Sequence, residues 1–354
     1  MLLYIVFLSN KKNNIGRGGI VFVLSLSIVL LGIVITIQPL SGDPYRYAMG
    51  FLKFRDFALD EIFTYRTGEY FYRLLQWIVG QFTDNPHLLF LVIYVIFILT
   101  FYRALKNIYP SFERYIVFSF YILYPYFLFY VVNGKRQGLG LAFMVLAISF
   151  LMKNENKKAF LLVIVSGLFH SGMFLVLPLV AVFVFFKDKR LLKISSIILI
   201  GSVVVSILGI NEMISGPLGD MLVTETRYTA YLTDQFDEIN YRTGFRLDFA
   251  FFSFLPIFLY IFLRKRIREN ERKKVQNWLA LYMLLNSIYH IFSFVPFNDR
   301  FSIFSWFILP IVCYMIIRSV SNKYAALFTL SLLLLNLFFL QTYTGHIFQS
   351  LEIL

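Results

Sequence analysis

The most informative polar stretch of the sequence lies between two strongly apolar segments and reads Asn133-Gly134-Lys135-Arg136-Gln137-Gly138. Two cations beside segments this apolar are costly to bury without a partner. If a helix begins here, its free N–H groups, the positive end of its dipole and Arg136 converge on one anion. A phosphate or diphosphate group fits this requirement. The alternative is a short loop in which Lys135 and Arg136 reach lipid phosphates and the two glycines only allow close helix packing.

A second arginine begins a later apolar segment in the same way, in Asn298-Asp299-Arg300. Asn298 or Asp299 can cap the helix that follows. A cation in the first turn opposes the helix dipole, so the position of Arg300 is unfavourable unless an anion is shared. The sequence therefore predicts a second anion-binding position here, with a structural Asp-Arg pair as the alternative.

Two histidines occupy different settings. His170 lies in Phe169-His170-Ser171-Gly172, where a long apolar run is expected to bend, and the bend places it beside exposed helix ends. This setting suits a general base or a hydrogen bond to substrate, although a structural histidine is the alternative. His290 lies inside an apolar segment, where we expect a hydrogen bond between helices.

Carboxylates, arginines and tyrosines are mixed in two polar segments. The first contains Asp43-Pro44-Tyr45-Arg46-Tyr47 and, further on, Arg66-Thr67-Gly68-Glu69-Tyr70. The second, residues 211–248, has the same mixture and is net acidic. Such residues suit a sugar, whose hydroxyl groups take hydrogen bonds while its apolar face stacks on aromatic rings. For the second segment a solvated lid is the alternative.

The elements that must position these residues are apolar segments long enough to cross a membrane. Of the 354 residues, 59% are hydrophobic and only 15% are charged, whereas a soluble domain carries about a quarter charged residues. About 20 apolar residues cross a hydrocarbon core of about 30 Å as a helix, so we expect one all-α, polytopic membrane domain of about eleven spans over residues 1–354. The expected segments are Gly19 to Leu40, Pro86 to Leu105, Tyr115 to Val132, Gly138 to Met152, Ala159 to Phe186 as two short helices, Lys193 to Ile210, Leu247 to Leu263, Gln276 to Phe297, Phe301 to Ile317 and Tyr324 to Tyr343.

The distribution of charge predicts an orientation for this bundle. If residues 11–17 are inside, the inner segments hold two thirds of the 33 Lys and Arg but only a quarter of the 20 Asp and Glu, as the positive-inside rule requires. The amino terminus is then cytoplasmic, and the outer half holds most carboxylates and all four histidines, which are His87, His170, His290 and His346. This rule also accounts for the net charge of +13, so we expect no nucleic-acid binding.

The two polar segments, residues 41–85 and 211–248, are outer loops in this orientation. Within the first, Glu69 to Phe82 is apolar enough to suggest a span, yet it contains Arg73 and Gln76. We interpret it as an interfacial or re-entrant amphipathic helix, because a crossing here would invert the charge balance of every later loop.

Several kinds of chemistry are not supported by the sequence. The single cysteine, Cys313, excludes an intramolecular disulfide and a Cys-based metal site. No G-x-x-x-x-G-K-S/T, H-E-x-x-H or G-x-S-x-G motif occurs, which argues against a nucleotide-driven pump, a zinc protease of that type and a standard serine hydrolase. We therefore expect no metal and no nucleotide cofactor.

The order of these polar elements resembles the EpsG family of polysaccharide polymerases, which are related in function to the Wzy polymerases of O-antigen and capsule synthesis. The matching positions are Asp43 with Tyr47 after the first long span, Glu69 before an amphipathic stretch, Arg136-Gln137 opening a helix, Phe169-His170-Ser171 inside a long apolar run, and Arg300 heading a late span. The resemblance implies a multispanning glycosyltransferase in the bacterial inner membrane. Such an enzyme joins exopolysaccharide repeat units carried on undecaprenyl diphosphate at the periplasmic face, and a chain-length regulator protein is a further expected partner.

Roles for the residues follow from this resemblance. His170 is the candidate base, with Glu69 and Asp43 as competitors, and Arg136, Gln137, Lys135, Arg300 and Tyr47 are the candidate substrate-binding residues. No nucleotide is required, because the diphosphate leaving group already stores the energy. Two alternatives stay open: a transporter (flippase) of lipid-linked oligosaccharide and a membrane acyltransferase acting on polysaccharide. The transporter is the poorer fit, since the expected spans carry few deep polar groups.

Overall fold

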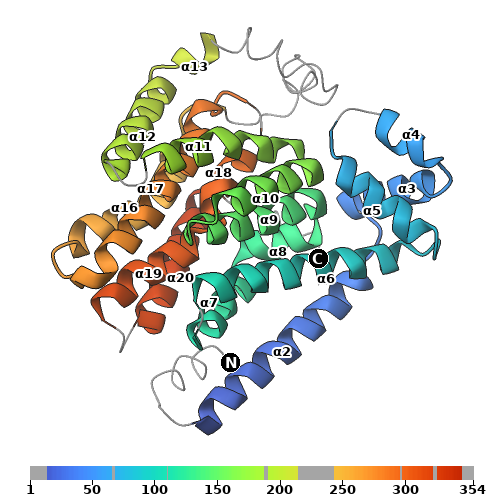
Figure 1. The fold of residues 1–354 in the computed structure, drawn as a ribbon, viewed down its shortest axis with the longest axis horizontal. Coiled ribbons are helices and arrows are strands. Elements are labelled where there is room, and N and C mark those ends of the chain that lie inside the picture. The colour runs from blue at the N-terminus through green and yellow to red at the C-terminus, as the bar shows by residue number, and fades with distance from the viewer. Residues whose placement is uncertain are drawn as a thin grey trace. The chain divides into compact units, whose positions relative to one another are not determined.

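The computed structural model describes residues 14–65, 68–109, 111–186, 190–213, 243–295, 297–321 and 325–344. Within these ranges all the regular elements are helices, which confirms the predicted all-α class (Figure 1). The chain folds as two compact units, unit 1 with Met1–Leu177 and Ser321–Leu354, and unit 2 with Pro178–Val320. The single membrane domain stays a prediction, as does the outer loop at 211–248, most of which lies outside the described residues.

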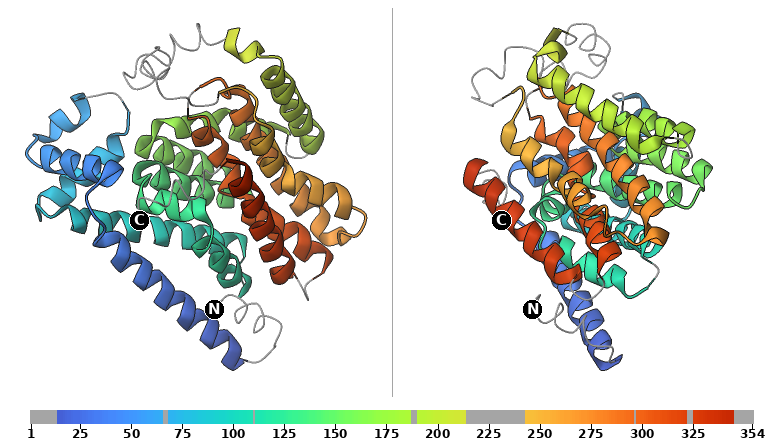
Figure 2. Two further views of the ribbon diagram at one scale, coloured as in Figure 1. Left: turned by 180° about the vertical axis from the view of Figure 1, so that it is seen from behind. Right: turned by 90° about the vertical axis from the view of Figure 1, so that its left-hand side faces the viewer.

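Unit 1 carries the helices that surround the predicted site. In order they are α2 (Asn14–Thr36), α3 (Gly42–Phe54), α4 (Leu59–Thr64), α5 (Tyr70–Gly80), α6 (Pro86–Ile108), α7 (Glu113–Ile122), α8 (Pro125–Val132), α9 (Lys135–Leu151), α10 (Asn156–Phe169), the 3₁₀ helix η1 (Ser171–Leu175) and α20 (Ala325–Thr344). Figure 2 shows α2 as a long helix that leads into the group formed by α3, α4 and α5. The short helices of the predicted first outer loop thus lie together.

Helix α9 lies at the centre of unit 1. Nearly all of its side chains are buried, and it packs against α6 and α10. Its glycines make this close approach possible: a Cβ on Gly140 would lie 2.8 Å from Cγ of Met173. The Ser166 hydroxyl of α10 also donates a hydrogen bond to the Gly140 carbonyl over 2.6 Å. The amino-terminal end of α9 is therefore held firmly by its neighbours.

The long apolar run from Ala159 to Phe186 breaks where the sequence predicts. Helix α10 ends at Phe169, His170 is extended with φ −151° and ψ 115°, and η1 and α11 (Val176–Phe186) follow. Phe174 folds back over Gly167, where an added Cβ would lie 2.4 Å from the Phe174 ring. Gly167 therefore permits the bend, and the bend leaves the His170 side chain outside a regular helix.

The predicted span from Tyr115 to Val132 is divided into α7 and α8, which are bent by 71° relative to each other. The cause is Pro125, which has no N–H to donate and disfavours helical backbone at the preceding residue. Tyr124 accordingly adopts φ −87° and ψ 112°. This pair is a broken span or a re-entrant loop.

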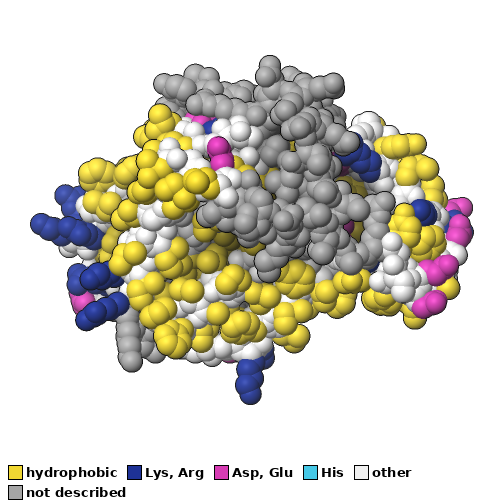
Figure 3. Space-filling view, turned by 90° about the horizontal axis from the view of Figure 1, so that it is seen from above, with side chains coloured by type: hydrophobic (Ala, Val, Ile, Leu, Met, Phe, Trp, Pro, Cys, Tyr) yellow, Lys and Arg dark blue, Asp and Glu magenta, His cyan; other side chains and the backbone are white. Residues whose placement is uncertain are grey.

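Three described helices are long and apolar enough to cross a membrane by themselves, and the bent pair adds a fourth if it is one span. The three are Arg17–Thr36, Pro86–Ile108 and Asp299–Val320, and shorter apolar helices accompany them. Apolar side chains cover much of the face shown in Figure 3, as expected for contact with lipid. The described part of the chain is thus consistent with a membrane helix bundle, and the count of about eleven spans stays a prediction.

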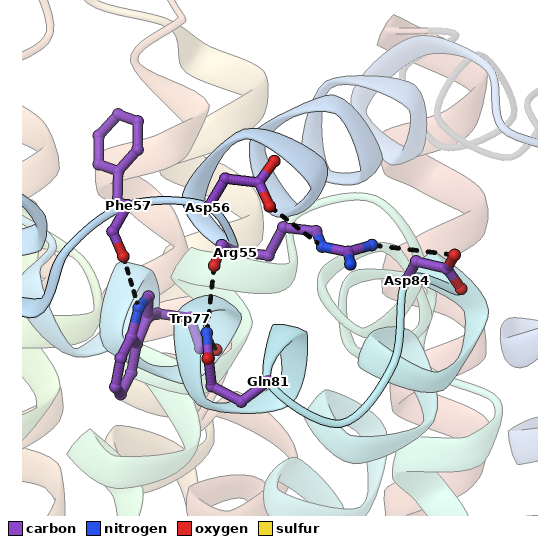
Figure 4. A network of polar contacts seen from close by, with 6 residues as sticks. All are labelled: Arg55, Asp56, Phe57, Trp77, Gln81 and Asp84. Carbon is purple, nitrogen blue, oxygen red and sulfur yellow. Dashed lines mark hydrogen bonds and ion pairs between the residues drawn. The ribbon is translucent and has the colours of Figure 1, made fainter.

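Polar contacts join the turn after α3 to α5 and the turn that follows it (Figure 4). The Arg55 guanidinium lies 3.5 Å from Asp56 and 3.8 Å from Asp84, and Gln81 Nε2 donates to the Arg55 carbonyl over 3.1 Å. Trp77 Nε1 donates to the Phe57 carbonyl over 2.9 Å. Because α5 has 11 residues, its length of about 16 Å is well short of a hydrocarbon core. The interfacial or re-entrant interpretation of this segment stays a prediction.

Unit 2 contains most of α11 and, in the described ranges, α12 (Leu191–Ile207), α13 (Ile210–Met213), α16 (Leu247–Leu263), α17 (Glu269–Ile291), α18 (Asp299–Trp306) and α19 (Leu309–Val320). The predicted interhelical hydrogen bond of His290 is wrong for the described residues, because both of its ring nitrogens are buried without a partner there. The ring packs against Phe245, Phe254 and Tyr289 at centroid distances of 6.1, 6.0 and 4.8 Å. Aromatic rings surround this histidine where the sequence suggested a polar partner.

Candidate functional site

Glu69 is the central residue of the candidate site. It stands at the N-cap position of α5 with φ 55° and ψ 31°, a left-handed conformation that is uncommon for a residue other than glycine. Its side chain makes no capping hydrogen bond to α5. Only 8% of Glu69 is exposed. Because a buried carboxylate needs partners, we expect its oxygen atoms to contact other side chains.

Those partners come from two distant parts of the sequence. Arg136 Nη1 forms an ion pair with Glu69 Oε2, and His170 Nδ1 lies 3.2 Å from Glu69 Oε1. Arg136 is the second residue of α9, and His170 occupies the break between α10 and η1. Residues 67 and 101 positions from Glu69 in sequence thus meet on one carboxylate.

Two tyrosines line the same cluster. The Arg136 guanidinium lies 5.4 Å from the ring centroid of Tyr47, and that ring lies edge-on to Tyr72 at 5.7 Å. Burial raises the pKa of Tyr47 and raises that of Tyr72 further. Both phenols therefore stay protonated at neutral pH and can donate hydrogen bonds.

Tyr72 is a residue that the sequence reasoning missed. Its signal was spacing: Tyr72 and Gln76 follow Glu69 by three and seven positions, so a helix places all three on one face. Tyr72, Arg73 and Gln76 are all buried in α5. The polar face of this predicted amphipathic helix therefore packs against α3 and α4, where Gln76 Nε2 donates to the Tyr47 carbonyl and Arg73 Nε donates to the Ile62 carbonyl.

Asp43 lies on the periphery of this cluster. It is in the first turn of α3, four residues before Tyr47, and its Oδ1 pairs with Arg46 Nη1 over 3.2 Å. Its side chain is 38% exposed and that of Arg46 is 81% exposed, so this pair contributes little to stability. Among the three predicted base candidates, the structure joins Glu69 and His170 directly.

Lys135 and Arg136 are adjacent in sequence but have different surroundings. Lys135 is buried, its Nζ donates to the Val132 carbonyl over 2.6 Å, and it lies 4.4 Å from the ring centroid of Phe90. The acceptor is the last residue of α8, where the helix dipole favours a cation. Gln137 is also buried. The substrate-binding roles of Lys135 and Gln137 stay predictions.

Glycines shape the turn that presents Arg136. A Cβ on Gly138 would lie 2.2 Å from the Tyr130 carbonyl oxygen, and one on Gly134 would lie 2.6 Å from the Tyr130 ring. Only glycine at these positions allows Tyr130 of α8 to pack this closely against the start of α9. Close packing of these glycines and a partly buried, ion-paired arginine therefore occur together.

Arg300 belongs to unit 2 and is described there by itself. It is exposed, and its guanidinium lies 5.2 Å from the ring centroid of Phe297. Asn298 occupies the N-cap position of α18, but the predicted side-chain cap is absent. Its Nδ2 donates to the Ser293 carbonyl over 2.7 Å, and its Oδ1, the atom that would accept from the helix, is buried without a hydrogen-bond partner among the described residues.

Among the described residues, no three His, Cys, Asp or Glu side chains are grouped in a way that could hold a metal ion. The polar side chains that do gather are Glu69, Arg136, His170, Tyr47 and Tyr72. Such a set can accept a proton, donate to oxygen atoms and balance negative charge.

The family model of the EpsG family matches residues 19–350. The chain belongs to the EpsG family. No curated protein and no solved structure matches it. The family match confirms the resemblance and, together with the apolar helices, indicates a membrane polysaccharide polymerase.

Proposed function

We propose that this chain is a membrane glycosyltransferase that polymerises undecaprenyl-diphosphate-linked oligosaccharide repeat units at the outer face of the bacterial inner membrane. The observation that carries the proposal is the buried carboxylate of Glu69, which contacts Arg136 and His170 together. Family membership supports the reaction class. The charge distribution of the sequence supports the orientation, with a cytoplasmic amino terminus.

His170 acts as the general base in this proposal. If the Nδ1–H group of His170 donates a hydrogen bond to Glu69 Oε1, Nε2 keeps its lone pair and can accept the proton of the attacking sugar hydroxyl. The hydroxyl oxygen attacks the anomeric carbon of the donor repeat unit, its proton passes to His170, and undecaprenyl diphosphate leaves. Glu69 fixes the ring and stabilises the imidazolium that forms.

Arg136 has two tasks in the same reaction. It balances the charge of Glu69, which would otherwise be buried alone. Its remaining N–H groups are available to the oxygens of the leaving diphosphate, where negative charge develops as the glycosyl bond breaks. The Tyr47 ring lies 5.4 Å from the same guanidinium and gives it a cation–π contact.

The test is complementation of a polymerase-deficient strain, with the sugar chains separated by length. His170→Ala should lower polymerisation by about 10²- to 10⁴-fold and leave mainly single-repeat products. His87→Ala is the matched control, because His87 Nδ1 lies 2.5 Å from the Thr36 carbonyl and should serve structure alone. Membrane levels of both variants are measured alongside.

Three outcomes would contradict the proposal. Long chains of normal abundance from His170→Ala would remove its catalytic role. Lipid-linked units that accumulate on the cytoplasmic side in the deletion strain would indicate a flippase. Full-length chains that have lost acyl groups would indicate an acyltransferase.

A further inference from the structure

We propose that the Tyr72 hydroxyl and the Nε–H of Arg136 together form a binding site for a phosphoryl group. This inference rests on the proposed function and deepens it, since it assigns the diphosphate of the lipid carrier to particular atoms. Tyr72 belongs to none of the positions that suggested the family resemblance.

The starting point is a pair of polar atoms without partners. In the part of the chain that the structure describes, Tyr72 Oη and Arg136 Nε are both buried and neither has a hydrogen-bond partner. A buried polar atom without a partner costs stability. Two of them in one cluster indicate a ligand that provides the missing partner.

Tyr47 contacts both side chains. Its ring contacts the Tyr72 ring edge-on at 5.7 Å and the Arg136 guanidinium at 5.4 Å. Burial is the main cause of the raised pKa of Tyr72, and the charges of Arg136 and Glu69 also act on it. The hydroxyl therefore lies within the electrostatic field of the same cluster.

The chemistry of the two atoms defines the class of ligand. Both are donors, because a protonated phenol and a guanidinium N–H each offer a hydrogen. The acceptor of the cluster, the Glu69 carboxylate, is already engaged by Arg136 and His170. A sugar hydroxyl needs donors and acceptors, whereas a phosphoryl oxygen only accepts, so the site fits a phosphoryl group.

The experiment measures binding by the purified full-length protein in lipid nanodiscs. The probes are undecaprenyl diphosphate, inorganic diphosphate and undecaprenol, which has no phosphate. Tyr72→Phe keeps the ring and removes the hydroxyl, and we expect it to weaken binding of undecaprenyl diphosphate by about 10-fold or more. Its thermal stability should be unchanged or higher, because no hydrogen bond of the free protein is lost.

The matched control is Tyr94→Phe. The Tyr94 hydroxyl already donates to the Ile28 carbonyl over 2.5 Å, so its removal should lower thermal stability and leave diphosphate binding within about twofold. The same Tyr72 dependence with inorganic diphosphate supports recognition of the phosphoryl group alone. Dependence limited to undecaprenyl diphosphate supports recognition of the lipid-linked form.

Two results would overturn the inference. One is wild-type affinity of Tyr72→Phe for both diphosphates, and the other is an equal loss of affinity for undecaprenol. If Tyr72→Phe binds normally while His170→Ala stops polymerisation, the phosphoryl site is wrong and the proposed function stands. If Tyr72→Phe loses diphosphate binding while His170→Ala polymerises normally, the site stands and the proposed base is wrong.

Discussion

The helix starts at α9 and α18 have similar sequences and different surroundings. An asparagine lies shortly before each helix, and an arginine is the second residue of each helix. At α9 the arginine is mostly buried and pairs with a carboxylate 67 positions away in sequence. At α18 the arginine is exposed and lies over Phe297, three residues before it.

The difference shows what a local motif leaves undecided. A helix dipole and a nearby arginine predict affinity for an anion at the amino-terminal ends of both α9 and α18. At α9 the anion is provided by the protein itself, through the left-handed turn that holds Glu69 at the start of α5. The functional value of the motif therefore depends on the element that packs against it.

Arg136→Ala should give the largest effect of any single change. It leaves the buried Glu69 carboxylate without its cation, which we expect to cost about 3–5 kcal/mol of stability and to lower polymerisation by more than about 100-fold. Chain-length analysis and thermal melting in detergent measure the two effects. Arg46→Ala is the control in the same unit, since Arg46 is 81% exposed. Equal effects of the two changes would show that burial of Arg136 has no special role.

Glu69→Gln should come next. The amide keeps the size of the side chain but loses the charge that orients His170 and pairs with Arg136, so we expect polymerisation to fall by about 100-fold. Asp43→Asn is the comparison, with an expected loss below about 10-fold, because Asp43 is partly exposed and pairs with Arg46. A larger effect of Asp43→Asn would transfer the role of Glu69 to Asp43.

Gly138→Ala should damage the α9 start through packing. Its methyl group would meet the Tyr130 carbonyl at 2.2 Å, so we expect a loss of about 1–3 kcal/mol in stability, with reduced chain length as a consequence. Gly201→Ala in α12 has no heavy atom within 4 Å and should be neutral or stabilising by up to about 1 kcal/mol. Thermal melting of both variants checks this difference. Equal stability would show that the turn relaxes freely.

Arg300→Ala should give the smallest effect, a reduction in polymerisation of less than about 10-fold. The reason is that Arg300 is exposed, so solvent screens its charge. The same chain-length assay measures it beside Arg136→Ala. If the loss matched that of Arg136→Ala, the two helix starts would be functional equals, and the predicted second anion-binding position would gain direct support.

The sequence by itself determined the membrane character, the all-helical class and the break at His170, and it provided the candidate site residues. Composition and apolar periodicity suffice for these features, because the lipid core admits few other solutions for the backbone. Sequence order also pointed to Asp43, Glu69, Arg136, His170 and Arg300 as one set, although it could not rank the three candidate bases. The bend at Pro125 was available as a signal and was missed.

Only the tertiary structure decided which polar groups meet. Packing between elements sets three local features. They are the left-handed backbone of Glu69, the close contact of Tyr130 in α8 with Gly138, and the extended backbone of His170. The aromatic surroundings of His290 and the unpartnered hydroxyl of Tyr72 have the same origin. Residue types fix what a side chain can do, and the fold fixes its partner, because a hydrogen bond or ion pair acts over only about 3 Å.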